Sequence, residues 1–104
     1  MSEQLIRIHL GENDRYQGRP LYAEILQRCL RAEIGLAVVY RGFEGFGAST
    51  RVHRPGMFGR STDAPIVVTA IDTQAKIQAL LPALDEIVDE GLIAISTVEV
   101  KRFG

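Results

Sequence analysis

Glycine and arginine are concentrated in one stretch of the chain, residues 41–65, and this combination is typical of anion binding. The stretch reads RGFEGFGASTRVHRPGMFGRSTDAP and holds five of the ten glycines and four of the ten arginines, with no acidic residue between Gly45 and Thr62. The glycines of Gly42–Gly47 let the backbone approach a ligand closely, and successive N–H groups can form a nest that holds an anion. Nearby arginines can pair with phosphate oxygens through two hydrogen bonds each. A flexible hairpin with solvated arginines is the alternative, and these residues alone leave it open.

Three other kinds of site match the sequence less well. Arg41–Phe46 is similar to the RNP1 pattern of RNA-recognition sheets, but one residue is inserted and the aromatic residues no longer alternate. His9 and His53 lie far apart in the sequence and lack the spacing of metal ligands. The single cysteine, Cys29, is on an apolar helix face, where a buried inert thiol is expected. No nucleophile has a neighbouring base and no carboxylates are paired, so we expect no catalytic activity and no metal site.

The composition indicates one soluble domain, residues 1–104, without a bias toward nucleic acid. Of the 104 residues 46% are hydrophobic and 24% are charged, and the formal net charge is −1. This length fits a single domain, and the charge argues against a nucleic-acid partner. No apolar run approaches the roughly 18 residues of a membrane span, and the polar start Met1–Gln4 is not a signal peptide. We therefore expect a cytoplasmic protein that is not inserted in a membrane.

Hydrophobic periodicity predicts four strands and two helices. The strands are expected at 4–10, 36–40, 66–71 and 92–100. One helix is expected over 21–34, with Gly35 as its stop, and a second over about 77–90, with Asp72 or Thr73 as its cap and Gly91 at its end. Pro82 should kink or divide the second helix, and residues 11–18 are expected to form a polar loop.

The order β-α-β-β-α-β predicts an α+β fold of the ferredoxin-like, split βαβ type. In this fold an antiparallel four-stranded sheet carries both helices on one face. The other face of the sheet is left without helices. In a domain of this size such a face commonly meets a partner subunit or a ligand, so we expect an oligomer.

Four strings of residues together resemble one protein family. They are GRPLYAEIL at 18–26, YRGFEGFGAS at 40–49, DAPIVVTAIDTQAKIQALLPAL at 63–84 and GLIAISTVEV at 91–100. These strings are similar to the PII-like family catalogued as a domain of unknown function, a branch of the nitrogen-regulatory PII superfamily. The similarity covers nearly the whole chain, and the R-G-x-x-G-F-G and D-x-P strings are its most specific parts.

The resemblance implies a PII-like homotrimer whose sheets face inward, and it makes the segment at about 41–65 the counterpart of the T-loop, a mobile arm that docks onto partner proteins. It also implies an adenine nucleotide (ATP, ADP or AMP) in the cleft between subunits, as an effector and not as a catalytic cofactor. The family's phosphate-binding residues match Arg41, Gly42, Gly45, Phe46 and Gly47, and in charge and position also Lys101 and Arg102. Arg51 and His53 are added to this nucleotide-binding set from charge and position alone.

These observations lead to the hypothesis of a PII-like signalling protein that binds an adenine nucleotide between subunits and contacts an unidentified partner protein through its arm. A membrane transporter is one candidate partner. The tyrosine-bearing T-loop sequence of PII is missing, so uridylylation is not implied. The alternative is a trimeric metal-responsive protein that resembles the divalent-ion tolerance proteins and uses His9 or His53.

Overall fold

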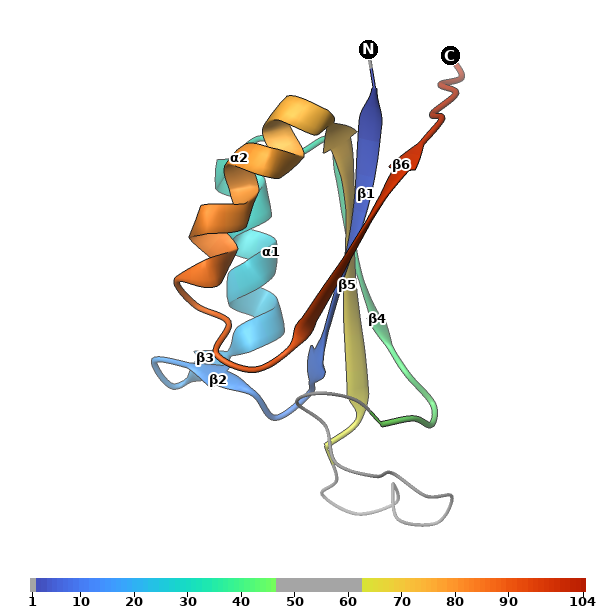
Figure 1. The fold of residues 1–104 in the computed structure, drawn as a ribbon. Helices are drawn as coiled ribbons and strands as arrows, with labels where there is room; N and C mark the ends of the chain where they lie inside the picture. The colour runs from blue at the N-terminus through green and yellow to red at the C-terminus, as the bar shows by residue number, and fades with distance from the viewer. Residues whose placement is uncertain (1, 47–62) are drawn as a thin grey trace.

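Two helices lie on one face of a four-stranded antiparallel sheet (Figure 1). The structure is a computed structural model and describes residues 2–46 and 63–104. The main elements are β1 (Glu3–Gly11), α1 (Leu21–Arg31), β4 (Leu36–Arg41), β5 (Pro65–Thr73), α2 (Gln74–Asp85) and β6 (Leu92–Val98). The strand order β4-β5-β1-β6 places β5 and β1 at the centre. The predicted ferredoxin-like α+β fold is therefore confirmed.

The core lies between the helices and the face of the sheet that they cover. Alternate residues of β1 and β5 point into it, and both helices add their apolar sides. The fully buried large side chains include Ile6, Ile8, Val68, Ile25, Ile77, Leu80 and Leu84. Burying a side chain of this size contributes about 1.5–3 kcal/mol relative to exposure. A slip of one residue in β1 would turn its apolar row to the other face, so this alternation fixes the register.

Helix α1 ends earlier than the sequence predicts, and Glu33 makes the turn instead of Gly35. Glu33 has φ of +58°, in the left-handed region. Its N–H donates to the Leu30 carbonyl at 3.0 Å, and the Ile34 N–H donates to the Cys29 carbonyl at 3.1 Å. This pair of bonds is the Schellman motif that usually places a glycine at the Glu33 position. Gly35 comes two residues later and starts the approach to β4.

Helix α2 runs through Pro82 to Asp85, so of the two predicted effects of Pro82, a kink or a division, the division does not occur. Proline lacks only the N–H that would bond to the carbonyl four residues earlier, that of Gln78, and Gln78 is exposed, so water can satisfy this carbonyl. Thr73 caps the start, because its Oγ1 accepts the Lys76 N–H at 3.3 Å. The helix ends six residues before Gly91, so Gly91 does not stop it.

Residues 11–18 are not simply a loop, because a small hairpin forms there. Its strands are β2 (Arg15–Tyr16) and β3 (Arg19–Pro20). The two residues between them, Gln17 and Gly18, have φ of +50° and +81°, as a two-residue turn of type I′ requires.

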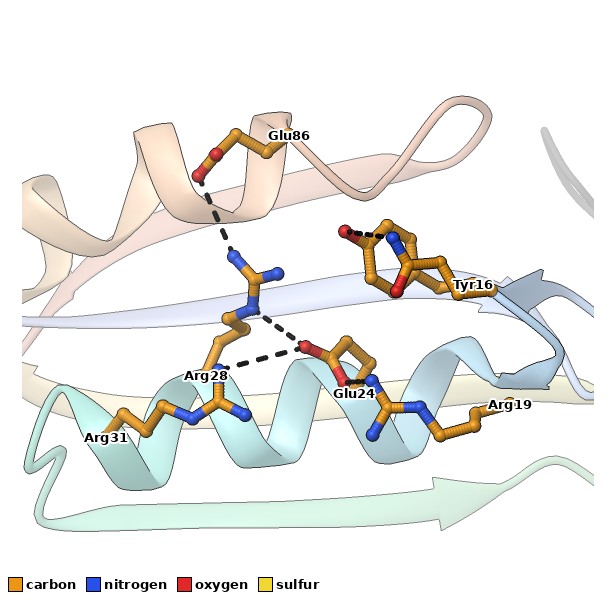
Figure 2. A network of polar contacts seen from close by, with 7 residues as sticks. Tyr16, Arg19, Glu24, Arg28, Arg31 and Glu86 are labelled. Carbon is orange, nitrogen blue, oxygen red and sulfur yellow. Dashed lines mark hydrogen bonds and ion pairs between the residues drawn. The ribbon is translucent and has the colours of Figure 1, made fainter.

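A buried carboxylate fastens this hairpin to both helices (Figure 2). Glu24 of α1 is only 2% exposed, and its two oxygens accept from Arg19 at 2.5 Å and from Arg28 at 2.9 Å. The hydrogen bond from Arg28, with the charge of Arg19, lowers the pKa of Glu24. Arg28 also lies 3.7 Å from Glu86, at the end of α2, and 5.8 Å from the centre of the Tyr16 ring. The cluster joins β2, β3 and the two helices, and we assign it a structural role.

Candidate functional site

The described ends of the 41–65 segment lie side by side where β4 and β5 pair. We call residues 41–46 and 63–65 the arm base. Arg41 stands opposite Ile66 in the β4–β5 register. The Gly42 N–H donates to the Pro65 carbonyl at 2.6 Å and adds one more bond beyond the strand pair. The sheet therefore brings together two strings that are far apart in the sequence, R-G at 41–42 and D-A-P at 63–65.

A turn after β1 closes over this junction. The Glu12 N–H donates to the Ala64 carbonyl at 2.8 Å, and the Asn13 N–H donates to Oδ1 of Asp63 at 2.7 Å. The Asp63 carboxylate also lies against Gly11, where a Cβ would overlap it. The turn of residues 11–14 thus holds the C-terminal side of the arm base through backbone bonds.

Arg41 is held at the surface of this junction by Glu12. Its Nε lies 3.0 Å from Oε2 and its Nη2 lies 3.2 Å from Oε1, which is a bidentate pair. The Arg41 side chain is 58% exposed and that of Glu12 is 31% exposed. The hydrogen bonds that Arg41 donates to Glu12 raise the pKa of Arg41, so the guanidinium keeps its charge. Such a planar fork takes carboxylate or phosphate oxygens equally well.

The sequence analysis missed Glu12, which belongs to the segment predicted as a polar loop. The order of the predicted strands does indicate that the residue after the first strand lies near the arm base. In a ferredoxin-like sheet the first strand pairs with the strand that follows the arm, so the residue after the first strand must lie near the arm base. Neither the residue type nor its local spacing indicates the contact.

Packing explains why residue 42 is glycine. A Cβ at this position would lie 2.7 Å from Cγ of Pro65 and 3.2 Å from its carbonyl oxygen. Ordinary contacts between carbon atoms are about 3.5–4.0 Å. A Cβ at Gly45 would meet the same ring atom at 3.6 Å. The absence of side chains at Gly42 and Gly45 therefore leaves space for the Pro65 ring, whatever further role these glycines have toward a ligand.

Of the remaining predicted site residues of this stretch, the structure describes Phe46. Phe46 is 77% exposed, and neighbouring Phe43 is 89% exposed. Gly47, Arg51 and His53 lie outside the described residues. Exposed aromatic side chains offer a surface for stacking or for contact with another protein.

The C-terminal segment, which includes Lys101 and Arg102, lies at the opposite end of the sheet from the end of β4 (Figure 1). Nη2 of Arg102 lies 2.9 Å from Oε2 of Glu3, the first residue of β1, whereas Arg41 pairs with Glu12, one residue beyond its end. Nine residues of strand span about 30 Å at roughly 3.3 Å per residue. A single chain therefore does not bring the two predicted groups of phosphate ligands together.

The face of the sheet without helices presents three cross-strand rows of mostly apolar side chains. They are Leu36–Ile71–Leu5–Ser96, Val38–Thr69–Arg7–Ala94 and Tyr40–Val67–His9–Leu92. Eight of these side chains, from β1, β4 and β5, line a shallow hollow of about 530 Å³. Leu36, Val38, Tyr40 and Leu92 are each more than a third exposed. Such a surface favours association with another protein surface.

The described residues contain neither a cluster of metal ligands nor a membrane-spanning helix. Within 2–46 and 63–104 no three histidine, cysteine or acidic side chains gather as metal ligands, and His9 lies on the helix-free face beside Arg7. In the same part of the chain no helix is long and apolar enough to cross a membrane.

The fold of the described residues is similar to that of solved PII-like proteins. The chain matches CPII of Thiomonas intermedia bound to ADP, AMP and acetate with a TM-score of 0.63 and 15% identity, over 97% of this chain and 90% of that one. It matches the same protein bound to ADP and bicarbonate with a TM-score of 0.65 and 16% identity, over 98% and 91%. The protein thus has the fold of the PII-like class.

Within that class the chain belongs to the family DUF190, described as "Uncharacterized ACR", which matches residues 3–100. It is 30% identical over 100 residues to a UPF0166 protein of Aquifex aeolicus, covering 96% of this chain and 94% of the relative. It is 31% identical over 100 residues to a UPF0166 protein of Methanocaldococcus jannaschii, covering 95% and 92%. The predicted membership of a PII-like family of unknown function is confirmed.

Proposed function

We propose that this protein is a non-enzymatic PII-like regulator that binds an adenine nucleotide in a cleft between the subunits of a homotrimer. The nucleotide acts as an effector, and the 41–65 segment contacts a partner protein. CPII, with the same fold, is described as bound to ADP and AMP. The observation in this chain that carries the proposal is the position of Arg41, a half-exposed guanidinium fixed at the junction of the R-G and D-A-P strings.

The charge distribution along β1 supports a site shared between chains. Arg41 lies at one end of β1, and Lys101 and Arg102 lie at the other, about 30 Å away at the usual rise per strand residue. A nucleotide polyphosphate is much shorter than this. If both groups contact one nucleotide, the C-terminal residues must come from a neighbouring subunit.

The helix-free face supports the association of subunits. Its rows are apolar except for Arg7, His9, Thr69 and Ser96, and it is the only broad face of the described sheet that no helix covers. A second copy of the chain offers the same surface, as a symmetric assembly requires. Packing the three sheets inward would bury these rows.

Calorimetry with ATP, ADP, AMP and adenosine tests nucleotide binding. At least one nucleotide should bind the wild-type protein, and Arg41→Ala should weaken its binding by about tenfold, the value of one charge-assisted hydrogen-bonded contact. Arg15→Ala is the matched control, because Arg15 is exposed in the hairpin at the same end of the sheet. Binding of none of the four compounds would refute the proposed ligand. Chromatography of the recovered nucleotide should show it unchanged, and turnover would refute the non-enzymatic role.

Light scattering coupled to gel filtration tests the assembly. The wild-type protein should elute at three times the chain mass of 11.5 kDa. Val38→Asp places a charge in the middle row of the helix-free face and should give monomers. Gln27→Asp, on the exposed side of α1, should leave the trimer intact. A monomeric wild-type protein, or an intact trimer of Val38→Asp, would contradict this part of the proposal.

A further inference from the structure

The Nε and Nη2 groups of Arg41, which could bind a phosphate, are already bonded to a carboxylate of the same chain. Glu12 occupies Nε and Nη2, one of the edges of the guanidinium that arginine uses for bidentate binding of oxyanions. A phosphate that approaches this edge meets the negative charge of Glu12 as well as the positive charge of Arg41. The contact therefore bears directly on the affinity of the site.

The Glu12 side chain can separate from Arg41 while the backbone of the turn stays in place. Its backbone N–H bonds to the Ala64 carbonyl at 2.8 Å, and this bond does not depend on the side chain. The Arg41 side chain is 58% exposed and that of Glu12 is 31% exposed, so water can replace either partner. The pair can open at small cost while the backbone of the junction stays in place.

The other two carboxylates of this junction accept hydrogen bonds from the backbone. Asp14 accepts the Gly11 N–H at 3.0 Å, and Asp63 accepts the Asn13 N–H at 2.7 Å. Both belong to the same junction as Glu12. Glu12 is therefore the carboxylate that offsets the charge of Arg41, as long as the two side chains remain paired.

We infer that Glu12 is an internal competitor for the anionic ligand of Arg41. The inference rests on the proposed function, since the ligand is the phosphate of the bound nucleotide. When the phosphate binds, the Arg41 guanidinium exchanges the Glu12 carboxylate for phosphate oxygens, and the Glu12 side chain turns to solvent. Glu12 thereby lowers the affinity of the site and makes ligand binding change the contact between the turn and the N-terminal side of the arm base.

The test measures the binding of ADP and of adenosine to wild-type protein, Glu12→Gln and Glu12→Ala. Both variants should bind ADP about two- to fivefold more tightly, as expected when an exposed ion pair is no longer broken on binding. Adenosine, which has no phosphate, should bind all three proteins alike. In an Arg41→Ala background, Glu12→Gln should have no effect. Glu90→Gln removes the same charge from the turn before β6, beside Asp14, and should change ADP binding little.

Each outcome decides between the alternatives. Unchanged or weaker ADP binding by folded Glu12→Gln and Glu12→Ala would overturn the inference, and weaker binding would make Glu12 a residue that positions Arg41. Tightening that persists in the Arg41→Ala background, or that extends to adenosine, would also overturn it. If neither the wild-type protein nor the variants bind any adenine nucleotide, the proposed function fails as well. If the wild-type protein binds and only the Glu12 effect is missing, the proposed function survives.

Discussion

Replacing Gly42 with alanine should destabilise the protein through a collision with Pro65. The added Cβ would lie 2.7 Å from Cγ of Pro65, about 1 Å inside an ordinary carbon–carbon contact. The neighbour is a closed ring that cannot rotate away, and the Gly42 N–H is bonded to the carbonyl of the same proline at 2.6 Å. The two strands must therefore move apart. Overpacking of this kind costs about 1–3 kcal/mol, so we expect a loss near 2 kcal/mol and a melting temperature about 8 °C lower.

Thermal and urea unfolding at one fixed protein concentration measure this loss. Gly35→Ala is the matched control, because its Cβ would meet only Oδ2 of Asp72 at 3.4 Å, which is an ordinary contact. The decisive measurement is the double variant with Pro65→Ala, which removes the ring atom at 2.7 Å. In this background the cost of Gly42→Ala should fall by more than half. Additive effects of the two substitutions, or equal losses at Gly42 and Gly35, would refute the reasoning.

Three further measurements address other parts of the molecule. The N–H groups of the backbone lower the pKa of Asp72 below 3.8, so its contribution to stability is present above that pH and is lost as pH falls through the folded value. Asp72→Asn should cost about 1 kcal/mol at neutral pH and should flatten the acid limb of urea melts. Burial raises the pKa of the Cys29 thiol to about 11, so alkylation at mildly alkaline pH should be slow until denaturant is added. Glu24→Gln should lower the melting temperature more than Glu86→Gln, because Glu24 is buried among arginines and the Glu86 side chain is 71% exposed.

Periodicity predicted the elements of this fold because each of them buries one regular face. The helical spacing of Ile25 and Cys29, and the alternation of Ile6 with Ile8, are seen directly in the core. The ends of the elements were predicted less well, because local bonds decide them. Glu33 takes the left-handed position although Gly35 is nearby, and its carbonyl accepts from Nζ of Lys76 at 2.9 Å. No pattern in the sequence around Glu33 reveals this long-range bond.

The candidate site was predicted in part for a similar reason. The residue types of the 41–47 stretch pointed to an anion, and Arg41 does lie at the surface of the junction. Its partner Glu12 is 29 residues away and is chosen by strand register, which a single sequence does not display. The glycine at 42 was interpreted as room for a ligand, which stays a prediction; the structure adds that this glycine makes room for Pro65. Gly47, Arg51 and His53 stay predictions.

The arm base has two kinds of contact: backbone hydrogen bonds that hold it together, and a side-chain ion pair that a ligand can replace. Backbone bonds fasten it, from Gly42 to Pro65 and from Glu12 to Ala64, and these bonds persist whatever the side chains do. The Arg41–Glu12 pair is different, because it is a contact between exposed side chains and costs little to exchange. An anion at Arg41 therefore has no need to open the sheet in order to act. In the exchange that we infer, only the partner of the Arg41 guanidinium changes. Because Glu12 contacts both Arg41 and Ala64, this exchange would link the ligand to both sides of the arm base.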